Sequence, residues 1–190
     1  MTGGQLLKSR RAVRRYEPRP VPDQLVESIL DTARHAPSSM NGQPWCFIVI
    51  RNPATKQALA RLKNAYCPPD KHVYPADFLA DAPVIVAIGI ERQRGHQRER
   101  ENGVLAAAYV MLAAWELGLG SVFLSAYQPS DPGLAHAIAT LLGLPDGIEP
   151  VALVPLGFPA ESPTPKALRA LSDIVHDERF GQQRAARTSA

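Results

Sequence analysis

The sequence predicts a single globular domain in which helices and strands alternate. Its 190 residues include 45% hydrophobic and 21% charged residues, a balance that lets one domain bury a core without disulfides or metal. Helix-spaced apolar stripes alternate with short β-branched runs, an order compatible with a doubly wound parallel sheet. The glycine signature of that architecture, GxGxxG at a strand-to-helix turn, is absent, and GLGS at residues 118–121 follows a helix instead. We expect the domain over residues 1–181 and a frayed tail over residues 182–190, which lack an apolar anchor.

In the first half of the chain, two predicted helices flank one predicted strand. Residues 22–36 are expected to be helical because apolar side chains recur at helical spacing before Pro37 ends the stretch. This apolar stripe consists of Val26, Ile29, Leu30 and Ala33. CFIVIR at residues 46–51 is short, β-branched and followed by Asn-Pro, so it predicts a buried strand. ATKQALARLKNAY at residues 54–66 predicts the second helix.

The second half contains the most apolar elements. VIVAIGI at residues 84–90 is continuously apolar and predicts a second interior strand. The helix expected over residues 102–117 is apolar nearly all round and rich in alanine, so we expect it to be buried on several sides, as in the core of a dimer. Residues 121–127 predict a third strand, residues 130–143 a capped helix, and residues 151–157 a fourth strand.

The cysteine, histidine and serine patterns argue against several classes of site. Cys46 and Cys67 form no ligand pair, and the five histidines show neither i,i+4 nor HxH spacing, so we expect neither a disulfide nor a metal site. Ser121 and Ser125 lack the G-x-S-x-G setting of a serine hydrolase. No stretch reaches the roughly 20 apolar residues of a membrane span, and the first residues lack the apolar core of a signal peptide. We therefore expect a cytoplasmic protein, and its net charge of +3 does not by itself imply a polyanionic partner.

Residues 10–19, RRAVRRYEPR, hold five arginines against one glutamate and are here termed the basic segment. In a helix, Arg10 and Arg14 would form an i,i+4 like-charge pair that an anion between them would relieve. With Arg11 they are close enough to converge on one object, and the planar guanidinium group suits phosphate oxygens. The residues alone leave two alternatives open: a solvated basic end of the chain, and a nucleic-acid-binding arm in which only Tyr16 could stack on a base.

A second unusual stretch, HAPSSMNGQPW at residues 35–45, places short polar side chains between two prolines. Ser, Asn and Gln side chains, with backbone groups freed around Gly42, can donate to and accept from the edge of a planar heterocycle. The alternative is a turn and helix-capping cluster that satisfies only its local backbone. Residues 37–43 are here termed the polar loop.

Taken together, these stretches resemble the nitroreductase family of flavin enzymes. The resemblance extends from about Leu6 to Gly181 and rests on RRAVRRY, APSSMNGQPW, VLAAAYVMLAAWELGLGSVF, PLGFP and LSDIVHDERFG. It implies an α+β fold with a central mixed or antiparallel sheet flanked by helices. It also implies an intertwined homodimer that binds FMN in two clefts between the subunits.

The resemblance assigns cofactor-binding residues by position. It implies that the basic segment of one subunit and a late arginine bind the phosphate and ribityl chain, and that the polar loop of the other subunit lies against the flavin. The end of the third predicted strand would meet the isoalloxazine ring through its backbone. The implied cofactor-binding residues are Arg10, Arg11, Ala12, Arg14, Pro37, Ser38, Ser39, Asn41, Gln43, Leu124, Ser125 and Arg169.

Three residues depart from the family pattern. Ala12 stands where the family often has a serine, which removes one hydrogen bond to the phosphate unless Arg11 or Arg15 replaces it. Ser125 and Ala126 replace the Glu-Gly of one well-known branch, so the contact at the flavin edge is expected to differ.

The implied activity is that of an FMN-dependent oxidoreductase. Hydride would pass from NAD(P)H through flavin N5 to electron-poor acceptors such as nitroaromatics or quinones, in a ping-pong sequence without a catalytic side chain. Two alternatives stay open. One is a specialised flavin enzyme of the same fold that fragments flavin, dehalogenates an aromatic or oxidises a peptide; the other is a non-catalytic flavin carrier or a nucleic-acid-binding module. The first interpretation predicts a homodimer with neither nucleic acid nor membrane as a partner.

Overall fold

A five-stranded antiparallel sheet forms the centre of the protein. The computed structural model describes residues 2–68, 75–129 and 131–182. The strands are β1 (Trp45–Ile50), β2 (Val84–Glu91), β3 (Gly120–Ser121), β4 (Leu124–Ser125) and β5 (Ile148–Gly157). β2 lies between β1 and β5, and β5 pairs on its other side with both β3 and β4. Because every one of these pairings is antiparallel, the doubly wound parallel interpretation is wrong, and the predicted α+β fold with a helix-flanked sheet is confirmed.

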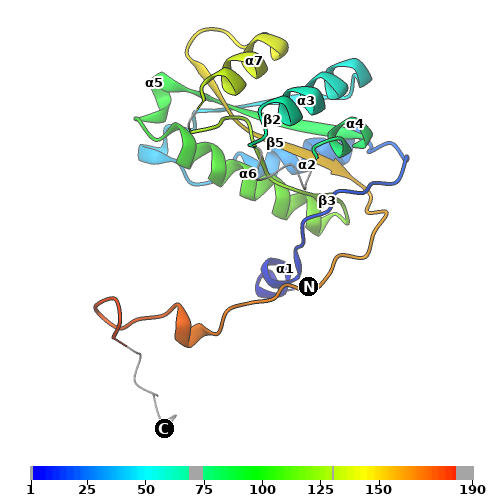
Figure 1. Ribbon diagram of the computed structural model, residues 1–190. Helices are drawn as coiled ribbons and strands as arrows, with labels where there is room; N and C mark the ends of the chain where they lie inside the picture. The colour runs from blue at the N-terminus through cyan, green and yellow to red at the C-terminus, as the bar shows by residue number, and fades with distance from the viewer. Residues whose placement is uncertain (1, 69–74, 130, 183–190) are drawn as a thin grey trace.

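Helices cover both faces of this sheet. The helices of the described chain are α1 (Gly3–Ser9), α2 (Asp23–Ala33), α3 (Pro53–Ala65), α4 (Phe78–Asp81), α5 (Arg92–Gly95), α6 (Glu99–Glu116) and α7 (Gly133–Leu142), with the 3-10 turns η1 (Ser39–Asn41) and η3 (Leu171–Asp173), and not all of them lie on the sheet. α2 and α6 pack on one face of the sheet, and α3, α4 and α7 pack on the other (Figure 1). The central strands β2 and β5 are therefore buried from both sides over most of their length, and their sequences are apolar there; the exceptions are Glu91 at the end of β2 and Glu149 near the start of β5.

Most of the predicted elements are confirmed, but the strand expected over residues 46–51 is β1, an edge strand in which only Ile50 is buried, so its predicted burial is wrong. The helix expected over residues 22–36 is α2, and three of the four residues of its stripe, Val26, Ile29 and Ala33, are buried. The strand expected over residues 84–90 is β2. The capped helix expected from residue 130 is α7, which begins after Pro132; the predicted cap itself lies outside the described residues.

The third predicted strand, residues 121–127, is interrupted. β3 and β4 share one register on β5, in which Val122 falls opposite Pro155. The Ala126 N–H donates to the Val151 carbonyl at 2.9 Å, so the backbone groups of Val151 point towards β3 and β4. In an antiparallel strand every second residue points the same way, and counting from Val151 this includes Pro155. Because proline has no N–H, the ladder breaks there and leaves two short strands.

Helix α6 packs on the sheet through small side chains. Gly103 lies so close to β5 that a Cβ atom there would be 2.5 Å from Val151 Cγ1. Away from the sheet, Val104 and Leu105 are 41% and 39% exposed. Within one chain the burial of α6 is therefore one-sided, and its role in a dimer core stays a prediction.

At both ends, the described part of the chain extends away from the sheet (Figure 1). The basic segment first runs beside β3, where Ala12 and Ser121 form a parallel bridge. After β5 the chain continues as residues 160–182, here termed the C-terminal arm, which contains η3. The predicted domain boundary at residue 181 stays a prediction, and the predicted frayed tail lies outside the described residues except for Gln182.

Candidate cofactor-binding site

The basic segment is held between β3 and the chain that leaves β5. The Val13 N–H donates to the Ser121 carbonyl at 3.0 Å, and the Glu17 N–H donates to the Phe158 carbonyl at 2.9 Å. Val13 is fully buried against Gly120, where a Cβ atom would lie 2.7 Å from the Val13 Cβ. The segment can therefore lie on β3 only because residue 120 has no side chain.

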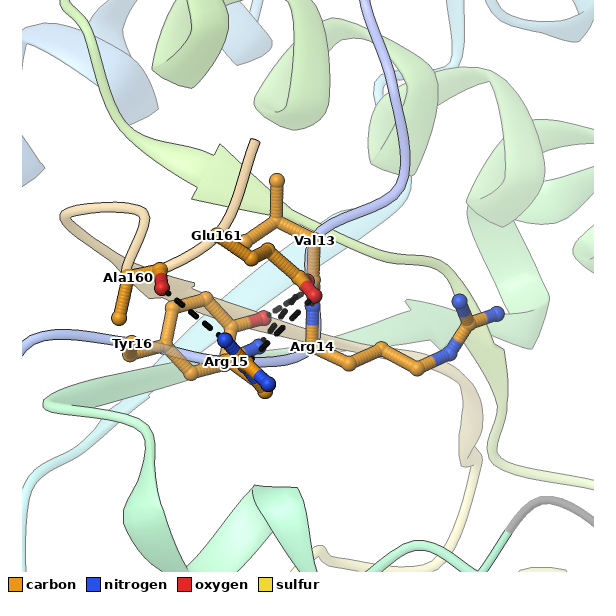
Figure 2. A network of polar contacts seen from close by, with 6 residues as sticks. All are labelled: Val13, Arg14, Arg15, Tyr16, Ala160 and Glu161. Carbon is orange, nitrogen blue, oxygen red and sulfur yellow. Dashed lines mark hydrogen bonds and ion pairs between the residues drawn. The ribbon is translucent and has the colours of Figure 1, made fainter. Parts of the chain in front are cut away.

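Arg14 and Arg15 have different surroundings (Figure 2). The carboxylate of Glu161 accepts the backbone N–H groups of Arg14 at 2.7 Å and Arg15 at 3.2 Å. The Arg15 guanidinium folds back to the same carboxylate, with Nε 3.9 Å from Oε2, and donates to the Ala160 carbonyl at 3.4 Å. The Arg14 side chain points away from Glu161. The Arg15 side chain thus contacts the C-terminal arm and is not placed to supply the hydrogen bond to the phosphate that Ala12 cannot make.

Arg10 and Arg11 follow the end of α1. Arg11 Nη1 donates to the carbonyls of Lys8 at 2.7 Å and Arg10 at 2.9 Å. Partial burial, and secondarily the charge of Arg11, lower the pKa of Arg10 from its ordinary value, so a nearby anion would stabilise the charged form. Together with Arg14 they form a cationic stretch, in which Ala12 contributes only backbone.

The polar loop is a tight turn with an outward-facing tip. Ser38 Oγ accepts the Gln43 N–H at 3.0 Å, and Gln43 Nε2 donates to the Asn41 carbonyl at 3.4 Å, so both side chains have local backbone partners, while their contact with a heterocycle stays a prediction. Met40, Asn41 and Gln43 have positive φ angles of 50°, 54° and 46°, a strained conformation that persists only where the surroundings enforce it. The side chains of Pro37, Asn41 and Gln43 are exposed, whereas Ser38 and Ser39 are half-buried.

Asn102, which was not predicted as a functional residue, anchors this loop from inside. Its side chain is 2% exposed, accepts the Ser39 N–H through Oδ1 at 3.0 Å, and donates through Nδ2 to the Gly95 carbonyl at 3.0 Å. Gly42 lies against the Arg94 carbonyl and leaves no room for a Cβ atom. These contacts explain how the strained loop is held.

The polar loop and the basic segment of one chain lie near opposite ends of α6. Asn102, which holds the loop, is in the first turns of α6, whereas Trp115 near its end donates Nε1 to Ser9 Oγ at 2.9 Å, just before the basic segment. At 1.5 Å per residue, the helix separates the two positions by about 20 Å. The structure of one chain therefore does not bring these two groups of predicted residues together.

Strand β4 places the predicted flavin-edge residues Leu124 and Ser125 on the middle of β5. Lys63 of α3 donates its Nζ to the Ser125 carbonyl at 2.8 Å. Burial lowers the pKa of Lys63, while the nearby Cys67 acts in the opposite direction. Among the described residues no carboxylate forms an ion pair with Lys63, so the peptide carbonyl is its main partner.

Arg169 lies in the C-terminal arm, where its Nη2 donates to the Asp173 carbonyl at 2.9 Å. The arm carries four exposed large apolar side chains, of which Phe180 is 93% exposed. The others are Leu168, Leu171 and Ile174. An exposed apolar run of this kind is typical of a segment that packs on another chain.

Comparison with known proteins identifies the family. The model of the nitroreductase family matches residues 7–158, which is most of the chain. The chain belongs to the nitroreductase family. Its relatives include the NADH dehydrogenase of Thermus thermophilus, which is 31% identical over 194 residues covering 87% of this chain and 91% of that protein.

Solved structures of the nitroreductase family agree with this fold. An FMN-dependent nitroreductase from Clostridium difficile superposes with a TM-score of 0.78 at 26% identity, covering 92% of this chain and 98% of that one. An iodotyrosine deiodinase bound to FMN and 3-iodo-L-tyrosine superposes with a TM-score of 0.76 at 28% identity, covering 93% and 99% of the two chains.

The described ranges of the chain hold neither a cluster of metal ligands nor a membrane-spanning helix. Within residues 2–68, 75–129 and 131–182, no three His, Cys, Asp or Glu side chains gather in a way that could hold a metal ion. No helix in these ranges is long and apolar enough to cross a membrane. Cys46 and Cys67 are both free thiols.

Proposed function

We propose that the protein binds FMN and acts as an oxidoreductase that takes reducing equivalents from NAD(P)H. The observation that carries the proposal is the anchored stretch of three arginines beside β3 in a chain of the nitroreductase family. The names of similar proteins support it, because one is an FMN-dependent nitroreductase and another an NADH dehydrogenase. The electron acceptor would be a small electron-poor molecule such as a nitroaromatic or a quinone.

The donors of the basic segment fit a phosphorylated cofactor. Arg10, Arg11 and Arg14 can form charge-assisted hydrogen bonds with phosphate oxygens, whereas Ala12 can offer only its backbone. Arg169 would add a guanidinium group from the C-terminal arm. When bound, FMN supplies the hydride-transfer chemistry, so the residues of the chain have to hold and orient it rather than react.

Neutral groups would bind the ring system. Leu124 and Ser125 would present their backbone at β4, and the exposed side chains of Asn41 and Gln43 would offer donors and acceptors from the polar loop. No charged side chain of the polar loop is needed for these contacts. The arginines of the basic segment would thus form a cationic site for the phosphate, and β4 with the polar loop would form a neutral site for the heterocycle.

We infer a homodimer in which each cleft combines the basic segment of one chain with the polar loop of the other. Two observations support it: the separation of about 20 Å along α6, and the exposed apolar side chains of α6 and of the C-terminal arm. Association would remove those side chains from water. Sedimentation velocity should therefore give the mass of a dimer, and a stable monomer at micromolar concentration would contradict this assembly.

An absorbance spectrum tests the proposed activity. The purified protein should be yellow, should bleach when NAD(P)H is added without oxygen, and should regain its colour when a nitroaromatic or a quinone is added. Free FMN at the same concentration is the control for uncatalysed reduction. A colourless protein that does not bind added FMN would refute the proposal.

Reductive dehalogenation of an aromatic compound is a second candidate function. The supporting observation is that the iodotyrosine deiodinase structure matches this chain about as well as the nitroreductase does, with TM-scores of 0.76 and 0.78. Halide release from a halogenated phenol, compared with reduction of a nitroaromatic by the same preparation, would distinguish the two activities.

The surroundings of the arginines argue against the nucleic-acid alternative. Arg15 pairs with Glu161, and Arg19 lies 3.6 Å from a Glu17 oxygen and 3.3 Å from the centre of the Phe158 ring. The positive charge of the basic segment is therefore partly neutralised within the chain. Binding to nucleic acid that weakens steeply as salt increases would revive this alternative.

A further inference from the structure

The C-terminal arm begins with a carboxylate that reaches back to the basic segment. Glu161 Oε1 accepts the N–H groups of Arg14 at 2.7 Å and Arg15 at 3.2 Å, although 147 and 146 residues of chain separate them. The preceding residue, Ala160, donates its N–H to the Arg15 carbonyl at 2.9 Å. Two successive residues of the arm therefore hold the basic segment at one point (Figure 2).

These contacts bend the basic segment. Successive N–H groups of a straight strand point to opposite sides, so their convergence on one oxygen requires a bend at Arg14 and Arg15. Tyr16 supports the same bend, because its hydroxyl donates to the Val13 carbonyl at 2.7 Å. Burial, and secondarily Glu161, raise the pKa of Tyr16, so its hydroxyl remains a donor. The bend directs the Arg15 side chain towards Glu161 and the Arg14 side chain away from it.

The ion pair between Arg15 and Glu161 is the weaker part of this network. The Arg15 side chain is 74% exposed and its Nε is 3.9 Å from the carboxylate, a geometry that contributes little to stability. Hydrogen bonds from backbone N–H groups to a carboxylate are shorter and stronger. The main effect of Glu161 is therefore on the path of the backbone.

We propose that Glu161 is a positioning residue of the phosphate site, which holds the bend that presents Arg14 to the cofactor phosphate and withdraws Arg15 from it. The inference rests on the proposed function, because it assumes that FMN binds at the basic segment. It predicts an effect confined to the phosphate end of the cofactor. A residue that only stabilises the fold would affect binding of the whole cofactor.

Comparison of FMN with riboflavin, which has the same ring system without the phosphate, tests this difference. In Glu161→Ala, the dissociation constant for FMN should rise about tenfold, the equivalent of one charge-assisted hydrogen bond, while that for riboflavin stays unchanged. Glu161→Gln keeps an acceptor oxygen and should retain most of the FMN affinity. Fluorescence titration measures all of these constants.

Glu149→Ala is the matched control. The Glu149 side chain is 22% exposed and also pairs with two arginines, Arg92 at 3.7 Å and Arg100 at 4.0 Å, but neither belongs to the basic segment. This variant should bind FMN and riboflavin as the wild type does. Glu161→Asp, which keeps the charge but shortens the side chain, serves if Glu161→Ala does not fold, and should show a smaller loss that is again specific to FMN.

Three results would overturn the inference. Equal losses of FMN and riboflavin affinity would show a general structural role for Glu161. Unchanged FMN affinity in a folded variant would show that the bend is not needed, and tighter FMN binding would show that the carboxylate competes with the phosphate. A wild-type protein that binds neither ligand would refute the proposed function itself, which is a distinguishable result.

Discussion

Replacement of Asn102 by alanine should destabilise the protein through the polar loop. The Asn102 side chain is nearly fully buried and joins two segments, accepting from the Ser39 N–H and donating to the Gly95 carbonyl, each at 3.0 Å. Asn102→Ala removes both bonds at once. It leaves the strained residues of the polar loop without their internal anchor.

The expected loss of unfolding free energy depends on how deeply the two hydrogen-bond partners of Asn102 are buried. The buried Gly95 carbonyl would keep the Arg98 N–H as a donor at 3.0 Å and lose only the Asn102 amide, the equivalent of one hydrogen bond worth about 0.5–1.5 kcal/mol. The Ser39 N–H is half-buried and regains water in part, so we assign it about 1 kcal/mol. The free energy of unfolding should fall by about 1.5–2.5 kcal/mol, which for a chain of this size corresponds to about 3–10 °C in Tm.

Urea denaturation measures this free energy, and amide hydrogen exchange at Ser39 reports the loop alone. Ser39→Ala is the matched control, because it keeps the backbone N–H that Asn102 accepts and should change stability little. A change of less than about 0.5 kcal/mol in Asn102→Ala, a size typical of unconnected surface substitutions, together with unaltered exchange at Ser39, would refute the anchoring role.

Three further predictions concern single residues. Arg14→Ala should weaken FMN binding by about 10- to 150-fold in a fluorescence titration, and unchanged affinity would place the phosphate elsewhere. Gly120→Ala should lower the free energy of unfolding by about 1–3 kcal/mol in urea, because the new Cβ meets Val13; an unaltered midpoint would contradict the close contact. Burial lowers the pKa of Lys63 in the folded protein below the ordinary value of 10.5. Between these two pKa values the unfolded chain binds more protons than the folded one, so the free energy of unfolding should rise with pH. Lys63→Met should lose this rise, and equal pH slopes in denaturation series of both proteins would refute the assignment.

Elements with strong local patterns could be predicted from the sequence. β2 and α2 follow directly from a continuous apolar run and from a helical stripe. The division of residues 121–127 could not be predicted in the same way, because it depends on Pro155 in a different strand and on the register between them. The antiparallel order of the sheet likewise depends on pairings that local sequence does not encode.

In the candidate site, too, some residues stand out in the local sequence and others gain their role only through contacts between distant segments. The arginines of the basic segment and the side chains of the polar loop stand out by composition, whereas Asn102, Glu161 and Lys63 do not. These three residues contact partners 63, 147 and 62 residues away, respectively, and only the folded chain brings them together. The residues proposed to bind the cofactor stand out by local chemistry, whereas the residues that contact and hold their segments do not.

Because the basic segment and the polar loop of one chain lie near opposite ends of α6, two chains with substitutions in different segments should complement one another in a mixed dimer. Consider a proposed dimer of one subunit altered at Arg14 and one subunit altered in the polar loop. One cleft would combine the altered basic segment with the altered polar loop, and the other would combine the intact basic segment with the intact polar loop. Co-expression of two inactive variants would then restore flavin binding that neither shows alone, a form of interallelic complementation that a self-contained subunit does not allow.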